Sequence, residues 1–312
     1  MRTGSRNIVH LGNAHLLRSV QTMAAVPPRD PALGGRLLVP AESEVSTQPR
    51  LYAICATCHG PAAAGRRNCW SCALAAAQLG SLPVVLPVFL FGLGSPAHRA
   101  LVGYKASVTP AGRAAWGAAL SGVLAEWLGR HAGCVLGERD GCLVVPVPSS
   151  SGGRPSWQGR HPLESLSRSA IAGSGCLQLA TVLQPGGRPP RRLRATAAGF
   201  AVERPDALRG RTVIVLDDMY VSGSRSLSAA AALSRAGARV AAVVPLGRLV
   251  RPDHNEATAA FWAARRALPA DAAHCSRCSA PRSLERRALQ QGPRRASAVP
   301  LRSYGVSERL AA

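Results

Sequence analysis

The hydrophobic pattern of this chain is most regular between residues 212 and 246. Thr212–Leu216 is an almost wholly apolar run, typical of a buried strand, and the Ala-rich stretch Ser226–Arg235 predicts a helix that stops at Gly237. Val240–Leu246 is a second apolar run. A strand, a helix and a strand in this length predict a right-handed parallel crossover, and therefore an α/β fold.

Further elements are predicted nearer the N-terminus. Val84–Leu93 and Cys142–Val147 are apolar runs bounded or punctuated by Gly and Pro, as short buried strands are. Between them, Gly112–His131 has apolar side chains at spacings of three and four, which predicts an amphipathic helix. Another helix is expected to begin near Pro162, because proline is well tolerated at the first helical position.

Composition divides the chain into four parts. Residues 1–50 have several prolines and no sustained period, so we expect them to be mostly disordered. Residues 51–80 contain two closely spaced cysteine pairs, and residues 81–255 contain the predicted sheet. Residues 256–312 form an Arg-rich tail with a short helical stretch and a third cysteine pair, and we expect this tail to be partly disordered.

The two cysteine pairs near the N-terminus have the spacing of a metal site. Cys55/Cys58 and Cys69/Cys72 are separated by ten residues, so that four thiolates can converge on one tetrahedral zinc ion. Such an ion would replace the core that a segment of about thirty residues cannot build. Its role would be structural, because four cysteines leave no open position, and His59 is not expected to be a ligand.

The third cysteine pair, the cysteine spacing and the apolar runs indicate in which cellular compartment the protein is expected. Cys275/Cys278 has only His274 beside it, so loose thiols or incidental spacing are favoured over a second metal site, which stays open. Cys-x-x-Cys spacing favours metal binding in a reducing compartment over disulfides. The first thirty residues lack a secretory pattern, and the run Leu82–Leu93 is too short to span a bilayer. We therefore expect a cytoplasmic protein without a membrane span.

The formal net charge of +22 would ordinarily indicate a polyanionic partner such as nucleic acid. All basic residues except Lys105 are Arg, and Ala, Gly and Pro are abundant, which is a composition typical of a GC-rich genome. The Arg runs at 188–194 and 282–295 lie in Pro/Gly-rich or chain-end context, where solvated segments are the ordinary interpretation. The charge alone therefore leaves a nucleic-acid partner as one of two interpretations.

An acidic pair and a Gly-containing loop follow the most regular strand. Asp217 and Asp218 stand at its carboxyl end, where parallel sheets bind ligands, and adjacent carboxylates are costly unless a cation or hydroxyl groups meet them. The loop Met219–Ser226 leads small residues into a helix N-terminus, which suits a phosphate. Together they predict a sugar-phosphate site. The alternative is a helix-capping Asp with a solvated neighbour.

A second polar loop and one lysine are further candidates. Ser149–Arg154 follows a predicted strand and supplies hydroxyls, backbone amides and a guanidinium, which suit a pyrophosphate and its Mg²⁺. An ordinary flexible Ser/Gly loop is the alternative. Lys105 stands in a chain that otherwise uses Arg, so either a compact ammonium is required there or it is a chance survivor. Arg160 and His161 are candidates to extend the same anion site; the alternative for His161 is an incidental histidine in a loop.

The sequence VIVLDDMYVSGSRS at 213–226 resembles the phosphoribosyl pyrophosphate motif of type I phosphoribosyltransferases, in which two acidic residues precede a Thr-Thr-Gly loop. Val221 stands where the first Thr would be, Ser222 replaces the second, and Arg225 occupies a place where a hydroxyl usually contacts phosphate. Residues 51–252 resemble the ComF subgroup of that family, especially its actinobacterial branch. That resemblance rests on the order of the double Cys-x-x-Cys, GYK at 103–105, VPVPSSSGGR at 145–154, GRHP at 159–162, and Gly-Phe at 199–200.

The resemblance implies a type I phosphoribosyltransferase-like parallel sheet flanked by helices, with an N-terminal zinc-ribbon-like module. It also implies Mg²⁺-dependent displacement of pyrophosphate from ribose C1 by a nitrogen acceptor. The residues it assigns are Asp217 and Asp218 for catalysis, Val221, Ser222, Gly223, Ser224, Arg225 and Ser226 for the ribose phosphate, and Lys105, Ser150, Ser151 and Arg154 for the pyrophosphate. The competing hypothesis is a catalytically degenerate ComF-type module that binds nucleic acid or protein partners in DNA uptake.

Overall fold

The computed structural model describes residues 51–136, 141–149, 161–267 and 275. All of them lie in the first of two compact units, Met1–Cys278, while the second unit, Ser279–Ala312, lies outside the described residues. The predictions made for residues 1–50, for the loop residues 150–160 and for most of the tail beyond residue 267 also lie outside them.

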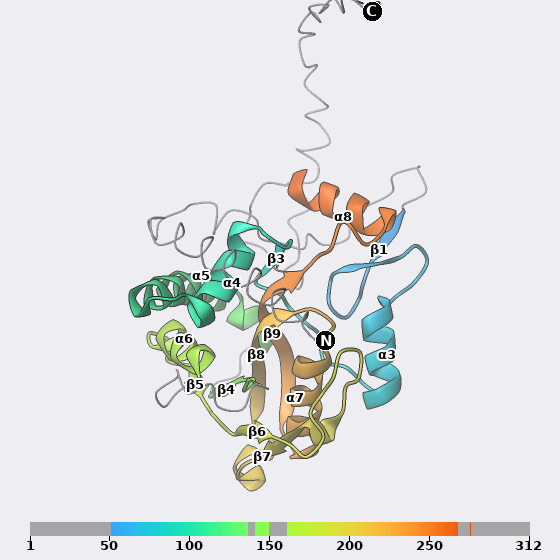
Figure 1. Ribbon diagram of the computed structural model, residues 1–312. Coiled ribbons are helices and arrows are strands. Elements are labelled where there is room, and N and C mark those ends of the chain that lie inside the picture. Colours follow the sequence, from blue (N-terminus) through green and yellow to red (C-terminus); the bar gives the residue numbers. More distant parts are fainter. Residues whose placement is uncertain (1–50, 137–140, 150–160, 268–274, 276–312) are drawn as a thin grey trace, which may run out of the picture. The chain divides into compact units, whose positions relative to one another are not determined.

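A five-stranded parallel sheet forms the centre of the described unit (Figure 1). Its two longest strands are adjacent and central, and every neighbouring pair is parallel. The strand order is β3 (Phe89–Phe91), β9 (Arg239–Leu249), β8 (Thr212–Tyr220), β4 (Cys142–Pro146) and β5 (Leu177–Leu179). Because helices cover both faces, β4 and β8 are buried along nearly their whole length, which explains their continuous apolar sequence.

The two faces of the sheet belong to two hydrophobic cores. Side chains alternate along a strand, so Ile214 and Leu216 pack into one core while Val213 and Val215 pack into the other. The first core is covered by α4 (Pro96–Ala106), α5 (Pro110–Leu136) and α6 (Pro162–Ile171), and the second by α3 (Trp70–Leu79) and α7 (Ser224–Arg235). Figure 1 shows these two groups of helices on opposite sides of the sheet.

Smaller elements surround the sheet. The hairpin of β1 (Tyr52–Ile54) and β2 (Pro61–Ala63) lies against α8 (Glu256–Ala267), where the Tyr52 and Phe261 rings meet edge to face with centroids 5.4 Å apart. An antiparallel ribbon and two short 3₁₀ helices precede the central strand of the sheet. These are β6 (Leu183–Pro185), η1 (Ala197–Gly199), β7 (Phe200–Val202) and η2 (Pro205–Leu208).

The α/β fold with a parallel sheet flanked by helices, predicted from the hydrophobic pattern, is confirmed. Strand β3 is shorter than the apolar run Val84–Leu93, because Pro87 has no N–H to donate. Before Pro87 the run is bound to β9 by a bridge between Val85 and Val243. Helix α4 was not predicted: Ser95 caps it by accepting a hydrogen bond from the His98 amide at 3.1 Å.

Among the described residues, no helix is long and apolar enough to cross a membrane.

Candidate functional site

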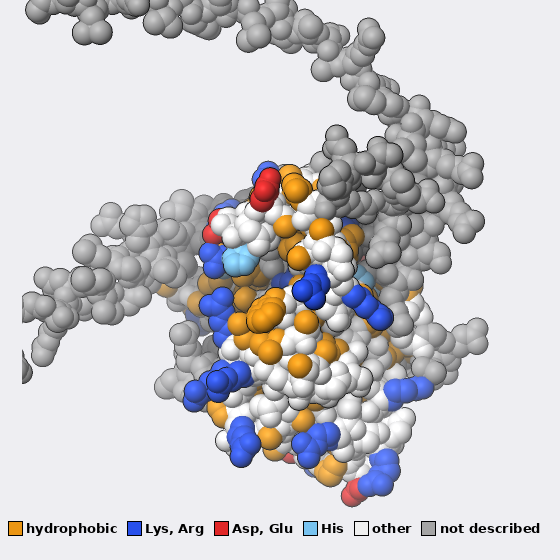
Figure 2. Space-filling view, turned by 90° about the vertical axis from the view of Figure 1, so that its right-hand side faces the viewer, with side chains coloured by type: hydrophobic (Ala, Val, Ile, Leu, Met, Phe, Trp, Pro, Cys, Tyr) orange, Lys and Arg blue, Asp and Glu red, His pale blue; other side chains and the backbone are white. Residues whose placement is uncertain are grey.

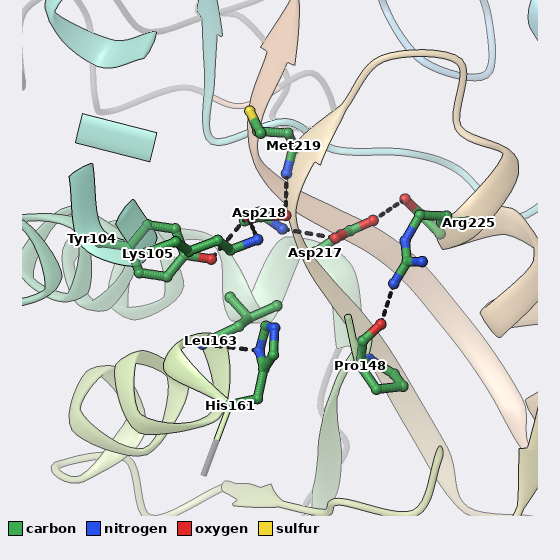
Figure 3. Close-up of polar contacts among 10 residues, drawn as sticks. Tyr104, Lys105, Pro148, His161, Leu163, Asp217, Asp218, Met219 and Arg225 are labelled. Atoms are coloured by element: carbon green, nitrogen blue, oxygen red, sulfur yellow. Dashed lines mark hydrogen bonds and ion pairs between the residues drawn. The ribbon is translucent and has the colours of Figure 1, made fainter. Parts of the chain in front are cut away.

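The acidic pair lies at the carboxyl end of β8, in the middle of the sheet. Asp217 and Asp218 are 5% and 7% exposed. The Asp218 carboxylate accepts a hydrogen bond from the Tyr104 hydroxyl at 2.8 Å and forms an ion pair with Lys105, both from α4 (Figure 3). The Asp217 carboxylate accepts one from the Ser226 hydroxyl on α7 at 2.5 Å. The two adjacent carboxylates thus contact helices that cover opposite faces of the sheet.

The different partners separate the protonation behaviour of the two carboxyls. Burial, together with the negative charge of Asp218, raises the pKa of Asp217 to about 7, although Ser226 partly opposes the rise. Burial also acts to raise the pKa of Asp218, but the Lys105 ammonium and the Tyr104 hydroxyl outweigh it and hold that pKa below its usual range. At neutral pH Asp218 is therefore ionised, while Asp217 is close to its midpoint.

The turn between β8 and α7 requires glycine. Gly223 has φ 78°, and a Cβ atom there would lie 2.1 Å from the Tyr220 hydroxyl oxygen. The hydroxyl oxygens of Ser222 and Ser224 lie 3.1 Å apart within this turn. Gly223 is the N-cap of α7, so no side chain of its own covers the helix N–H groups. Two hydroxyls and a helix N-terminus therefore follow the acidic pair directly.

The other three residues predicted for the ribose phosphate, Val221, Arg225 and Ser226, are exposed or make contacts outside this turn. The Arg225 guanidinium donates a hydrogen bond to the Pro148 carbonyl and lies 5.9 Å from the centre of the Phe200 ring (Figure 3). The Ser226 hydroxyl holds Asp217 and is 1% exposed. Val221 is 51% exposed. Of the six predicted ribose-phosphate residues, only Ser222, Gly223 and Ser224 therefore form one compact turn.

Two of the residues predicted on other segments also lie close to the acidic pair. Lys105 forms an ion pair with Asp218. His161 caps α6, where its Nδ1 accepts the Leu163 amide at 3.2 Å, and burial with the Lys105 charge lowers the pKa of His161 to about 4. Tyr104, which the sequence reasoning did not single out, belongs to the Gly-Tyr-Lys element, so that element was the available signal.

Three of the four residues predicted to bind pyrophosphate, namely Ser150, Ser151 and Arg154, lie outside the described residues.

The four N-terminal cysteines converge as the spacing predicted. Ligand atoms of Cys55, Cys58, Cys69 and Cys72 all lie within 4.8 Å of one another, and the Cys58 and Cys69 sulfurs are 3.7 Å apart. Cys69 is partly exposed, and the other three are fully buried. Four thiols at this spacing suit the tetrahedral geometry of zinc. The four cysteines could therefore hold a structural metal ion such as zinc, and His59 does not belong to this group.

The cysteine cluster and the loop after β8 are in contact through two buried side chains. The Tyr220 hydroxyl lies 3.5 Å from the Cys72 sulfur. The Arg248 side chain, 6% exposed, lies over the Tyr220 ring at 5.2 Å and donates a hydrogen bond to the Val221 carbonyl at 3.2 Å. Burial disfavours the charge of Arg248, but Cys58 and Tyr220 nearby raise its pKa. The N-terminal module is thus packed into the same core as the candidate loop.

The described residues define an α/β protein with a five-stranded parallel sheet, a buried acidic pair at its carboxyl edge, and a four-cysteine cluster that could bind a metal. In comparisons with known proteins, no family model and no curated protein sequence matches this chain.

Proposed function

We propose that this protein binds phosphoribosyl pyrophosphate with Mg²⁺ at the carboxyl end of β8, as a phosphoribosyltransferase of the ComF-like kind. The observation that supports it most is the buried pair Asp217 and Asp218, followed directly by the Gly223 turn at the start of α7. Carboxylates accept hydrogen bonds from ribose hydroxyls, and a helix N-terminus with small residues accommodates a 5′-phosphate. Ser222 and Ser224 add hydroxyl donors to that phosphate site.

In the proposed reaction the lone pair of a nitrogen acceptor forms a bond to ribose C1 while the bond from C1 to the pyrophosphate oxygen breaks. The pyrophosphate leaves with that electron pair, and Mg²⁺ would supply charge neutralisation on it. Positive charge develops on the ribose ring, so the ionised Asp218 and the partly ionised Asp217 favour it electrostatically. Positioning and charge therefore do most of the work, without a nucleophilic side chain.

Lys105 is assigned to the pyrophosphate, together with Ser150, Ser151 and Arg154. In the structure its ammonium is paired with Asp218. We infer that a bound ribose takes over Asp218 as acceptor and releases the ammonium toward the leaving group. A Lys on a helix beside the acidic pair has the length and the three donors for this exchange.

Calorimetric titration of phosphoribosyl pyrophosphate with Mg²⁺ tests the proposal. The wild type is expected to bind, and the Asp217→Asn/Asp218→Asn double variant to lose at least tenfold in affinity, about 1.4 kcal/mol. Asp206→Asn is the control, because Asp206 is an exposed carboxylate that forms an ion pair with exposed Arg209, three residues further along the chain. Absence of heat from the folded wild type, or equal affinity in all three proteins, would refute the site.

A second function is favoured by a different observation. The Arg run at 188–194 forms an exposed tight turn, with reciprocal backbone hydrogen bonds between Arg191 and Arg194. Lys and Arg side chains are spread over the face seen in Figure 2. The Arg225 guanidinium is bound to the Pro148 carbonyl and does not add to the phosphate turn. The competing proposal is therefore a catalytically degenerate module that binds nucleic acid or a competence protein. DNA binding that weakens steeply with salt, without Mg²⁺-dependent pyrophosphate release, would favour it.

We further propose that the four-cysteine cluster holds zinc in a structural role. Elemental analysis of the purified protein should show one equivalent of zinc less in the Cys55→Ser/Cys58→Ser variant than in the wild type. An unchanged zinc content would contradict this assignment.

A further inference from the structure

A second cluster of metal-ligating side chains lies at the C-terminal end of α5, apart from the acidic pair and from the N-terminal cysteines. His131 and Cys134 from α5 meet Cys275, which follows α8 in the chain. Ligand atoms of the three residues all lie within 4.8 Å of one another, and the Cys134 sulfur is 4.0 Å from Nδ1 of His131.

Helix geometry explains two of the three positions. His131 and Cys134 are three residues apart, so their side chains lie on one face of α5, one turn from each other. The His131 ring is 1% exposed and packs against Trp127 with centroids 5.3 Å apart. Cys275 is 4% exposed and packs into the same core as Leu128. The imidazole is thereby held in a fixed orientation at the edge of the core.

The chemistry of this set suits zinc. Two sulfurs and an imidazole are ligands that zinc prefers, with Zn–S near 2.3 Å and Zn–N near 2.0 Å. In a tetrahedral site such ligand atoms lie roughly 3.5–3.8 Å apart, so the 4.0 Å between the Cys134 sulfur and Nδ1 of His131 needs to close by only a few tenths of an ångström, and all three ligand atoms lie within 4.8 Å of one another. Neutral imidazole is the form of histidine that binds metal.

We propose that His131, Cys134 and Cys275 bind a second zinc ion, which fixes the chain after α8 to the end of α5. Cys134 and Cys275 are 141 positions apart in the sequence. A metal ion that closes so long a loop strongly reduces the conformational entropy of the unfolded chain. It also attaches Cys275, which follows α8 in the chain, to α5. Three protein ligands leave the fourth tetrahedral position to water, and the proposed role of the ion is to join the two segments.

Zinc stoichiometry tests the proposal on the full chain. The wild type is expected to contain two equivalents of zinc, and Cys134→Ser and Cys275→Ser one each, while Cys176→Ser, a partly buried cysteine outside both clusters, keeps two. A wild type with one equivalent, or two equivalents retained in both cluster variants, overturns the proposal.

Alkylation of the unaltered protein provides a measurement that does not depend on variants folding. Cys134 is exposed, so without metal it should react at once with iodoacetamide. With zinc bound, mass spectrometry should find Cys134 and Cys275 protected until a chelator is added, and then modified at least tenfold faster. Rapid modification of Cys134 in the untreated protein, equal to that after chelation, refutes a metal at this cluster.

Discussion

At the scale of single residues, the candidate site depends on how each carboxylate of the acidic pair is compensated. Asp218 is paired with Lys105 and the Tyr104 hydroxyl, whereas Asp217 has one hydroxyl donor, Ser226, and a neighbouring negative charge. A buried carboxyl compensated mainly by a neutral donor retains its proton to higher pH. The two members of the pair should therefore differ in their effects on stability.

The raised pKa of Asp217 predicts a specific pH dependence. Between the ordinary value of 3.8 and about 7, the folded protein holds a proton on Asp217 that the unfolded chain has lost, so this group's contribution falls as pH rises. Asp217→Asn removes that decline. The melting temperature of the variant should therefore fall less than that of the wild type between pH 4.5 and pH 8. Parallel melting profiles for the two proteins would show that Asp217 titrates normally.

The Tyr104 hydroxyl should contribute measurably to stability through Asp218. Tyr104→Phe keeps the ring in the core but removes a buried donor to an ionised carboxylate, at a cost of about 1.5–3 kcal/mol in the free energy of unfolding. Urea denaturation at pH 7 measures it. Tyr52→Phe is the control, since the edge-to-face contact of its ring with Phe261 is retained, and it should change the free energy by less. Equal effects would mean that the Asp218 hydrogen bond contributes little.

At the scale of elements, the junction from β8 to α7 depends on the backbone of one glycine. The positive φ of Gly223 turns the chain from the strand into the helix within three residues of Tyr220, whose ring occupies the space beside the glycine. No other residue type combines that conformation with so close an approach. The sequence predicted the loop, but the contact with Tyr220 is a property of how the strand and helix are packed.

Gly223→Ala should therefore destabilise the protein and distort the turn. Backbone strain alone costs about 1–3 kcal/mol, and displacement of the Tyr220 ring adds to it. Gly117→Ala is a matched control: Gly117 lies within α5 with nothing near its Cβ position, so alanine should stabilise by about 0.5–1 kcal/mol. Chemical denaturation of both variants measures these changes in the free energy of unfolding. A Gly223→Ala protein as stable as the wild type would contradict this account of the turn.

At the scale of the whole described unit, the cysteine cluster and the candidate phosphate turn form one packed assembly. The Tyr220 hydroxyl contacts Cys72, and Arg248 lies over the Tyr220 ring and donates a hydrogen bond to the Val221 carbonyl. A Cβ atom on Gly60, within the N-terminal hairpin, would lie 2.5 Å from the Arg248 guanidinium, which shows how closely the two parts approach. A change at the four-cysteine cluster should therefore affect the turn.

Metal removal provides the corresponding prediction. Treatment with a strong chelator should increase amide hydrogen exchange at 220–227 as well as at 52–72, because Tyr220 and Arg248 lose the ordered cluster that they pack against. Helix α6, at 163–171, belongs to the opposite core and carries no residue of either cysteine cluster, so it is the internal reference. Exchange that increases only at 52–72 would show that the cluster and the turn are independent.

The sequence by itself determined the features that depend on neighbours along the chain. These features are local patterns: continuous apolar runs, helical spacing, the acidic pair at a strand end and the spacing of Cys55 to Cys72. The apolar patterns can be read from the sequence because an element buries the same side-chain positions wherever it lies in the fold. For this reason the α/β class, β4, β8, β9, α7 and the four-cysteine cluster agree with the predictions. The role of the site in binding phosphoribosyl pyrophosphate stays a prediction.

Only the tertiary structure decided which distant groups meet. Lys105 lies beside Asp218, Arg225 is turned to Pro148, and Cys275 joins His131 at the end of α5. These partners are separated by 77 residues or more, and no local pattern records the crossing of strands and helices that brings them together. The physical reason is that side-chain pairing across a sheet depends on strand order and register, which the whole packed core selects.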